Sequence, residues 1–302
     1  LTMSEILPQL RQAKCTHVVS SSETAHIADL FPRGIRRTDI LTLVDLRDDS
    51  PVTTETLEQH EEFLHSATSN HLHSIVFTSG TTGKPKGVKL TYANHFHSAT
   101  SSSYRLGILP SDKWLLCMPL WHVGGLAIVL RSCLYGIALV LMEHGFDAPQ
   151  FARTLEKQHV TLVSLVPSML HQILSGAKQV HPPHSLRCAL LGGDRAPKNL
   201  LLEAAALKWP IALTYGLTEA ASQVCTAPPE LTKQKPGTVG KPLLGLRLDV
   251  RSSDGHIIPA DQVGELVVSG PAVMQGYCGS PEDTRAGLRE GRLYTGDMGY
   301  ID

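Results

Sequence analysis

The strongest constraint on the fold is a repeated alternation of strand-like and helix-like segments between residues 73 and 215. Short runs rich in Val, Ile, Leu and aromatic residues, typical of buried strands, recur between segments whose apolar residues follow a helical period. Strands that alternate with helices at these spacings indicate parallel β-α-β units with helices on both faces of the sheet. We predict strands at residues 74–78, 115–120, 137–142, 160–166, 186–191 and 211–215. The sequence therefore predicts an α/β fold with mostly parallel sheets flanked by helices.

Helix-capping residues locate several of the intervening helices. Thr91 is a favourable N-cap for a helix on which Tyr92, Phe96 and Ala99 fall on one face. Asp147, with a proline shortly after it, begins another helix. Further helices are expected at residues 4–13, 123–135, 168–174 and 197–207, and a short strand at residues 16–19.

The pattern of residues changes after about residue 228. Short strand-like runs joined by a Ser-Asp-Gly turn are typical of antiparallel hairpins. The hairpin strands are expected at residues 247–250, 256–258 and 264–269. We therefore predict an α/β core over residues 1–228, incomplete at its N-terminal end, and a smaller antiparallel β subdomain over residues 229–302.

Composition argues against several kinds of partner. The formal net charge of -1 gives no excess of positive charge for nucleic acid or for an anionic membrane surface. Arg131 and Gly136 interrupt the most apolar stretch, residues 124–142, so no membrane span is expected. The six cysteines are scattered and form no C-x-x-C pair, which indicates thiols in a reducing, cytoplasmic compartment rather than disulfides or a zinc site.

The most informative motif is a loop rich in glycine, threonine and lysine that follows the first predicted sheet strand. It reads Thr-Ser-Gly-Thr-Thr-Gly-Lys-Pro-Lys-Gly over residues 78–87. Glycines let backbone N–H groups approach an anion closely, hydroxyl groups donate hydrogen bonds, and lysines add positive charge. A proline follows Lys84 and no glycine lies five residues before Gly83, so the spacing of a Walker A phosphotransferase is absent. A phosphate-binding loop is favoured over a flexible, polar surface turn.

The predicted sheet offers an edge at which such a loop could meet others. Ligands of parallel sheets collect at the loops that leave the carboxyl ends of strands. Three loops rich in glycine or threonine are expected at that edge, namely those after Phe77, Leu191 and Leu213. Their convergence would form one shared cavity.

The loop at residues 78–87 resembles the phosphate-binding loop of the adenylate-forming superfamily, which contains acyl-CoA synthetases, luciferases and the adenylation domains of peptide synthetases. Four further segments are similar to motifs of that superfamily and occur in the expected order. They are residues 119–122, 215–219, 264–266 and 294–297. The resemblance covers nearly the whole chain from about residue 73 to residue 302. It implies the large domain of an enzyme that activates a carboxylic acid with ATP and Mg²⁺.

The resemblance also implies roles for individual residues. Tyr215 would stack on adenine, Thr218 would bond the α-phosphate, and Glu219 would coordinate Mg²⁺, a hard cation that suits carboxylate oxygens. Asp297 would accept hydrogen bonds from both ribose hydroxyls, and the loop hydroxyls with Lys86 would hold the β- and γ-phosphates. The residues implied in ATP binding are Thr78, Ser79, Gly80, Thr81, Thr82, Gly83, Lys86, Gly193, Asp194, Tyr215, Gly216, Thr218 and Asp297.

The resemblance implies two further groups of residues, which overlap. The implied catalytic residues are His122, Thr218, Glu219 and Lys86, and the implied acid-binding residues are His122, Gly192, Ser222 and Gln223. Simpler structural readings stay open beside these roles. His122 could be a structural histidine, Thr218 and Glu219 could merely cap a helix, Tyr215 could be a core residue, and Asp297 could belong to a turn.

Within the superfamily, four stretches resemble o-succinylbenzoate–CoA ligases, which belong to menaquinone and phylloquinone biosynthesis. They are residues 106–108, 112–115, 190–193 and 219–225. Ser222 and Gln223 follow a motif directly, where they could bond a second polar group on the acid. Asp194 and Arg195 depart from the small or apolar residues expected after the glycine pair. A fatty-acid or aryl-acid CoA ligase and a catalytically silent nucleotide-binding relative stay open as alternatives.

The implied enzyme is an AMP-forming acid–CoA ligase that takes ATP, a small carboxylic acid and CoA as substrates. Members of the superfamily ordinarily continue into a small mobile domain, which supplies a lysine for adenylation. We therefore expect the chain to be a truncated core that binds nucleotide but adenylates slowly or not at all on its own. The sequence leaves the oligomeric state open, with a homodimer as one option.

Overall fold

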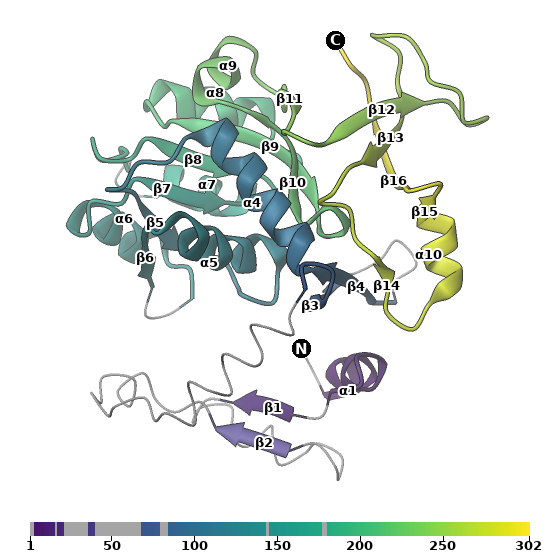
Figure 1. Ribbon diagram of the computed structural model, residues 1–302. Coiled ribbons are helices and arrows are strands. Elements are labelled where there is room, and N and C mark those ends of the chain that lie inside the picture. The colour runs from purple at the N-terminus through teal and green to yellow at the C-terminus, as the bar shows by residue number, and fades with distance from the viewer. Residues whose placement is uncertain are drawn as a thin grey trace.

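The computed structural model describes residues 3–15, 17–20, 36–39, 68–78, 84–142, 145–176 and 180–302. It confirms the expected fold class, because a largely parallel sheet of seven strands carries helices and is accompanied by separate antiparallel sheets (Figure 1). Within these ranges, no helix is long and apolar enough to cross a membrane.

The large sheet contains β5 (Lys113–Leu116), β6 (Ala138–Leu141), β7 (Leu162–Leu165), β8 (Cys188–Leu191), β9 (Ile211–Leu217), β10 (Ser222–Ala227) and β11 (Lys241–Pro242). Its strand order is β11-β10-β9-β8-β7-β5-β6. The strands from β9 to β6 in this order run parallel, whereas β10 and β11 add an antiparallel edge. Parallel strands occur where both sheet faces are covered, which explains their nearly continuous apolar sequences.

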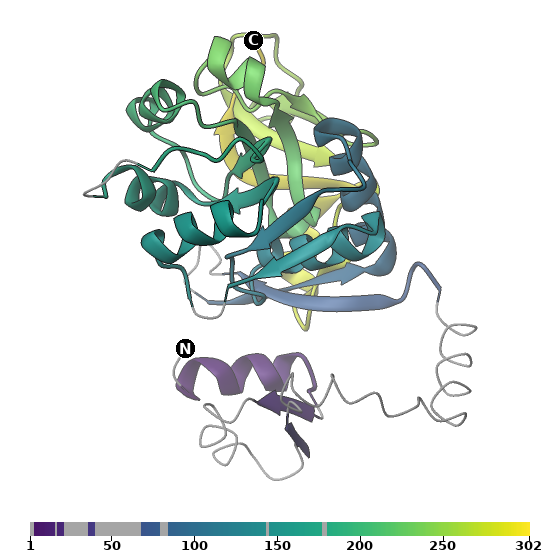
Figure 2. The same ribbon diagram turned by 90° about the vertical axis from the view of Figure 1, so that its left-hand side faces the viewer.

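The helices around this sheet are α4 (Tyr92–Leu106), α5 (Val123–Tyr135), α6 (Ala148–Lys157), α7 (Pro167–Leu174), α8 (Lys198–Ala206) and α9 (Pro229–Gln234). Helices α4 and α5 pack together on one face, and α6, α7 and α8 form a row on the other (Figure 2). Alternate residues of a strand point to opposite faces, so one strand supplies two cores. Leu115 and Val163 pack with Phe151 of α6, whereas Trp114 and Leu162 pack on the side of α5.

Helix α4 begins at the predicted residue but packs through a different face. Thr91 completes a capping box at its N-terminus. Of the predicted face, only Ala99 is buried, while Tyr92 and Phe96 are exposed. The buried face carries small and polar residues such as Ser98, whose hydroxyl donates a 2.6 Å hydrogen bond to a backbone carbonyl of the β9–β10 turn. Hydrophobic periodicity missed this face because its buried residues are mostly polar, and hydrogen bonds satisfy several of them, including Asn94 and Ser101.

The strand before the predicted phosphate-binding loop lies outside the large sheet. Strand β3 (Leu72–Thr78) pairs antiparallel with β4 (Lys86–Thr91), and β14 (Gly276–Tyr277) pairs with the other side of β4. The expectation that the loop after Phe77 leaves a strand of the parallel sheet is therefore wrong. An apolar, β-branched run predicts a strand but does not identify its pairing partners.

A four-stranded antiparallel sheet forms the C-terminal part of the chain. Its strands are β12 (Arg247–Arg251), β13 (Gly264–Ser269), β15 (Leu288–Arg289) and β16 (Arg292–Gly299), and α10 (Pro281–Gly287) precedes β15. The expected hairpin of β12 and β13 is confirmed, but the strand predicted at residues 256–258 is reduced to an isolated bridge. Strand β11, which follows residue 228, belongs to the large sheet. The domain boundary at residue 228 therefore stays a prediction.

The N-terminal helix contacts this C-terminal part. Helix α1 (Met3–Gln12) is followed by β1 (His17–Ser20), which pairs in parallel with β2 (Arg36–Asp39). The side-chain amide of Gln12 donates a 2.6 Å hydrogen bond to the carbonyl of Cys278, and the Cys278 thiol donates to the Gln12 carbonyl at 3.2 Å. Helix α1 is thus joined to the residue that directly follows β14.

Candidate active site

A cavity of about 400 Å³ opens where β5, β7, β8 and β9 reach their carboxyl ends. This is the edge at which parallel sheets bind ligands. The predicted site residues that line it are His122, Gly192, Gly193, Gly216, Thr218, Glu219, Ser222 and Gln223. The cavity thus brings every predicted acid-binding residue together with part of the predicted ATP-binding set.

The glycine pair after β8 leaves room at the base of the cavity. A Cβ atom on Gly192 would lie 2.5 Å from a methyl group of Thr214, and Gly193 has a φ of +83°, which side chains rarely adopt. These constraints agree with a plain strand-to-helix turn and also keep the cavity open. Asp194 is exposed and is absent from the lining; its carboxylate accepts a hydrogen bond from the backbone N–H of Arg195.

The turn between β9 and β10 presents Thr218 and Glu219 to the cavity. These residues open a short 3-10 turn whose N-cap, Leu217, makes no side-chain capping bond. The reading in which Thr218 and Glu219 merely cap a helix is therefore not supported. The turn closes tightly, because a Cβ atom on Gly216 would lie 1.7 Å from the Ser222 carbonyl oxygen.

Gln223 contributes a buried amide to the cavity wall. Its Nε2 donates a 2.8 Å hydrogen bond to the Thr226 hydroxyl, which lies 2.9 Å from that of Thr214. The Thr214 hydroxyl donates to the backbone carbonyl of Cys225, so the direction of this chain of bonds is fixed. Among the described residues, no group donates to Oε1 of Gln223. Oε1 of Gln223 is therefore a buried acceptor without a donor.

Tyr215 and Asp297 join two predicted motifs beside the cavity. The Tyr215 hydroxyl donates a 2.7 Å hydrogen bond to Oδ2 of Asp297. Burial raises the pKa of Tyr215, so the phenol stays a neutral donor. Asp297 belongs to strand β16 rather than to a turn and is exposed. Neither side chain lines the cavity, but Tyr215 directly precedes Gly216, which does.

Two residues that were not predicted from the sequence, Tyr277 and Asp283, contact the charged side chains of Glu219 and Lys86. The Tyr277 hydroxyl donates a 2.8 Å hydrogen bond to Oε1 of Glu219, and Asp283 forms a 2.7 Å ion pair with Lys86. Burial, followed by the Glu219 carboxylate, raises the pKa of Tyr277 and keeps it protonated. The sequence Ser-x-x-Asp that ends at Asp283 does signal a helix N-terminus, but no local signal identifies its distant partner.

The remaining predicted residues lie at the edges of this arrangement. His122 precedes α5 as its N-cap and is exposed, which argues against the reading as a buried structural histidine. Thr78 ends β3 and pairs with Lys86 across the hairpin. The other loop positions lie outside the described residues: Ser79, Gly80, Thr81, Thr82 and Gly83.

The site offers Mg²⁺ one carboxylate rather than a protein cage. In the part of the chain that the structure describes, no group of three or more His, Cys, Asp or Glu residues could hold a metal ion. Glu219 supplies a carboxylate in the cavity wall, one of whose oxygens is held by Tyr277. Mg²⁺ is commonly bound by one or two carboxylates together with substrate phosphates, and this donor set fits that mode.

The geometry agrees with a comparison to protein families. A family model described as AMP-binding enzyme matches residues 1–278. The chain belongs to this family. The residues that match the family model include those that line the cavity, together with Lys86 and Tyr277. Asp283 and Asp297 lie after the matched region.

Several relatives of this chain are named as 2-succinylbenzoate–CoA ligases or synthetases. A 2-succinylbenzoate–CoA ligase of Bacillus cereus is 44% identical over 229 residues, which cover 76% of this chain and 47% of the relative. The o-succinylbenzoate CoA synthetase (MenE) of Bacillus subtilis, solved with ATP and magnesium ion, has a TM-score of 0.84 and 32% identity. This alignment covers 100% of this chain and 60% of that chain.

The same Bacillus subtilis enzyme has been solved with the acyl-adenylate intermediate OSB-AMP. That structure has a TM-score of 0.82 and 32% identity, and the alignment covers 100% of this chain and 59% of that chain. The chain therefore spans about half the length of the curated relatives it matches.

Proposed function

We propose that this chain is the nucleotide- and acid-binding core of an AMP-forming carboxylic acid–CoA ligase whose acid is o-succinylbenzoate. The observation that carries the proposal is the cavity, in which Thr218 and Glu219 face His122 and the Gly192–Gly193 turn. The relatives named as 2-succinylbenzoate–CoA ligases support the choice of acid.

The proposed reaction has two balanced steps. A carboxylate oxygen of the acid attacks the α-phosphorus of ATP, and the bond to the β-phosphate breaks to give acyl-AMP and pyrophosphate. The thiolate sulfur of CoA then attacks the acyl carbon, and AMP leaves with the electrons of its acyl–oxygen bond. Negative charge builds on the departing pyrophosphate in the first step, so fixed positive charge and hydrogen-bond donors there lower the barrier.

The nucleotide would be held by residues from three parts of the fold. Thr218 would donate its hydroxyl to the α-phosphate, and Lys86 would neutralise the β- and γ-phosphates. The ring of Tyr215 would stack on adenine, while Asp297, already held by the Tyr215 hydroxyl, would accept from the ribose. Glu219 would hold Mg²⁺, which supplies charge neutralisation at the phosphates. The residues of the loop at 79–83 are assigned to the phosphates by resemblance alone.

The acid would occupy the part of the cavity nearest β10. Ser222 and Gln223 line the wall there, and Gln223 has an unused hydrogen-bonding atom. The unpaired atom of Gln223 is a carbonyl oxygen, which accepts hydrogen bonds, as do the keto group and the second carboxylate of o-succinylbenzoate. The Ser222 hydroxyl or a water molecule would donate to these groups of the acid, whereas an alkyl chain would leave such donors without a partner.

Two further parts of the proposal concern the setting of the enzyme. All six cysteines are free thiols, which supports a reducing compartment such as the cytoplasm. A homodimer and the division of the chain at residue 228 stay predictions.

Stable mimics of acyl-AMP test the proposal with this chain. We would measure thermal unfolding with the acyl-sulfamoyl adenosines of o-succinylbenzoate, benzoate and dodecanoate. A ligand present at a hundred times its Kd stabilises the folded state by about 2.7 kcal/mol. We expect the largest stabilisation from the o-succinylbenzoate mimic. Larger stabilisation by dodecanoate or benzoate mimics would refute the choice of acid, and no stabilisation by any mimic would refute the adenylate chemistry.

A further inference from the structure

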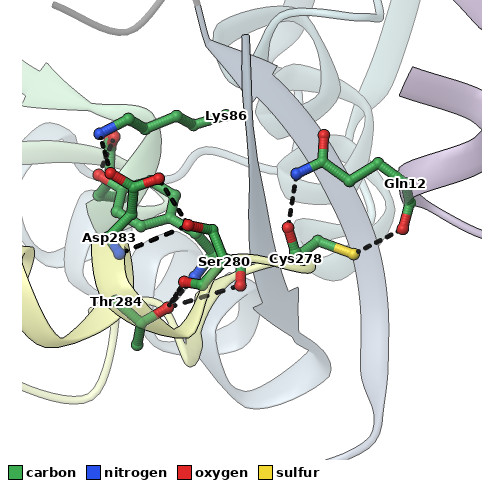
Figure 3. A network of polar contacts seen from close by, with 8 residues as sticks. Gln12, Lys86, Cys278, Ser280, Asp283 and Thr284 are labelled. Atoms are coloured by element: carbon green, nitrogen blue, oxygen red, sulfur yellow. Dashed lines mark hydrogen bonds and ion pairs between the residues drawn. The ribbon is translucent and has the colours of Figure 1, made fainter. Parts of the chain in front are cut away.

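The ion pair between Lys86 and Asp283 joins the phosphate-binding hairpin to the N-terminus of α10. Nζ of Lys86 lies 2.7 Å from Oδ1 of Asp283, and the two side chains are 20% and 35% exposed (Figure 3). Lys86 begins strand β4, at the foot of the loop that resembles a phosphate-binding loop. The side chain proposed to meet phosphate is thus paired with a carboxylate of the protein itself.

The carboxylate side of this pair is fixed. Ser280, the N-cap of α10, donates a 2.6 Å hydrogen bond to Oδ2 of Asp283, so both carboxylate oxygens are engaged. Lys86, followed by Ser280, holds the pKa of Asp283 below its usual range, so the group is ionised at neutral pH. The backbone N–H of Cys278 also donates a 2.7 Å hydrogen bond to the Gly87 carbonyl, which fastens this corner to β4.

The lysine side of the pair can move. A lysine side chain has a flexible four-carbon stem, and its ammonium group carries three donors. Nζ of Lys86 lies 5.3 Å from the ring centroid of Tyr277, whose hydroxyl bonds Glu219. Lys86 and Glu219 thus both contact Tyr277, and rotation about the bonds of its stem lets Lys86 change its partner.

We propose that Asp283 is a positioning residue that holds Lys86 before ATP binds, yields it to the β- and γ-phosphates, and takes it back as pyrophosphate leaves. The inference rests on the proposed function, because it requires ATP beside Glu219. Its physical basis is competition between two anions for one ammonium group. Because ATP must take Lys86 from this fixed carboxylate, Asp283 weakens ATP binding and hastens the loss of pyrophosphate.

The magnitude follows from Coulomb's law. Two unit charges about 4 Å apart in surroundings close to water change an affinity on the order of five-fold. The effect should decrease at high ionic strength, because both groups are partly exposed. AMP has no β- or γ-phosphate, so its affinity should not depend on Asp283.

Calorimetry with Asp283→Asn tests the inference. We expect the variant to bind Mg·ATP about five-fold tighter than the unaltered chain at low salt, to lose most of this gain at high salt, and to bind AMP unchanged. Asp283→Ser, which keeps a hydroxyl near Ser280, repeats the measurement if the amide disturbs α10. In a Lys86→Met background, Asp283→Asn should give no further gain in ATP affinity.

Asp254→Asn is the matched control, because Asp254 also accepts a hydrogen bond from a serine hydroxyl but lies on an exposed turn. It should leave the affinity for ATP unchanged. Equal or weaker ATP binding by Asp283→Asn, or an equal change for AMP, refutes the inference alone. If the unaltered chain binds no ATP, the proposed function fails, and the inference fails with it.

Discussion

The phenol of Tyr215 is held by the carboxylate of Asp297, 82 residues further along the chain, through a 2.7 Å hydrogen bond. This bond connects the end of β9 in the large sheet with β16 in the four-stranded sheet. An aromatic ring and a carboxylate are thereby held side by side, in the arrangement proposed above for adenine and ribose.

Replacing Asp297 with alanine should weaken nucleotide binding through the ribose. We expect the affinity for both ATP and AMP to decrease by about 2 kcal/mol, because hydrogen bonds to a charged group are lost. Calorimetry measures both ligands, and Asp254→Ala is a control on an exposed turn. Unchanged binding of AMP would contradict the role of Asp297. Equal effects on ATP and AMP separate this residue from Asp283, which should affect ATP alone.

Gly216→Ala should destabilise the fold strongly. The new Cβ atom would lie 1.7 Å from the carbonyl oxygen of Ser222, so the β9–β10 turn must open. We expect a loss of about 3 kcal/mol or more in the free energy of unfolding, measured with urea. Gly145→Ala is the matched control, because nothing lies within 4 Å of its added Cβ atom. Similar stabilities for the two variants would show that the turn is more adaptable than the structure indicates.

Two arginines in different surroundings should respond differently to replacement by methionine. Arg187 forms two hydrogen bonds, of 2.8 and 2.6 Å, with the buried carboxylate of Asp112. Burial alone would raise the pKa of Asp112, but the bonds from Arg187 and its other donors lower it. Arg187→Met leaves that charge without its partner and should cost about 3 kcal/mol of stability.

Arg131→Met should cost no stability. Arg131 is fully buried in α5, and among the described residues no carboxylate pairs with it. Its contacts are a 3.4 Å hydrogen bond to Ser98 and the ring of Trp114. Methionine keeps the packing and removes a desolvated charge, so we expect a change between zero and about 2 kcal/mol in favour of the folded state. A loss above about 1 kcal/mol in urea unfolding would contradict this expectation.

The stability of the chain should depend on pH through His95. Burial, with smaller effects of His73 and Arg131, lowers the pKa of His95 from 6.5 to about 4. Above pH 6.5 neither state is protonated at this residue, and below about pH 4 both are. Between these values only the unfolded state binds the proton, so stability decreases as pH falls, by about 3 kcal/mol in total.

Urea unfolding at several pH values measures this decrease. His95→Gln should make the curve flatter between pH 4 and 6.5, because glutamine does not titrate. His73 also has a lowered pKa, and its ring centroid lies 4.7 Å from that of His95. The pH dependence of stability in His73→Gln is therefore compared with that in His95→Gln. An unchanged slope in His95→Gln would show that other groups control the pH dependence.

Local signals in the sequence predicted the elements of the large sheet well. Helix α5 runs over Val123–Tyr135 as predicted, because Gly136 adopts the left-handed conformation that ends a helix. The strands of the parallel sheet were also found, since each is a short, largely apolar run bounded by turn residues. The predicted acid-binding residues all line one cavity because they follow or begin strands of one sheet.

Relationships between distant segments were beyond local signals. The partner of Glu219 is Tyr277, and the partner of Lys86 is Asp283, and neither pair has a spacing that a sequence pattern can register. The same limit explains why β3 was placed in the wrong sheet. The sequence of a strand indicates which of its residues are buried, whereas its neighbouring strands depend on how the whole chain packs.

Strand β4 lies between β3 and β14, and β14 comes from residues 276–277. During synthesis the hairpin of Lys86 therefore leaves the ribosome long before the segment that completes its sheet. Until then, one side of β4 offers unpaired N–H and C=O groups to any other nascent chain. The sheet that holds Lys86 can therefore close only after about 190 further residues have been synthesised, so the geometry of Lys86 depends on a segment that is made much later.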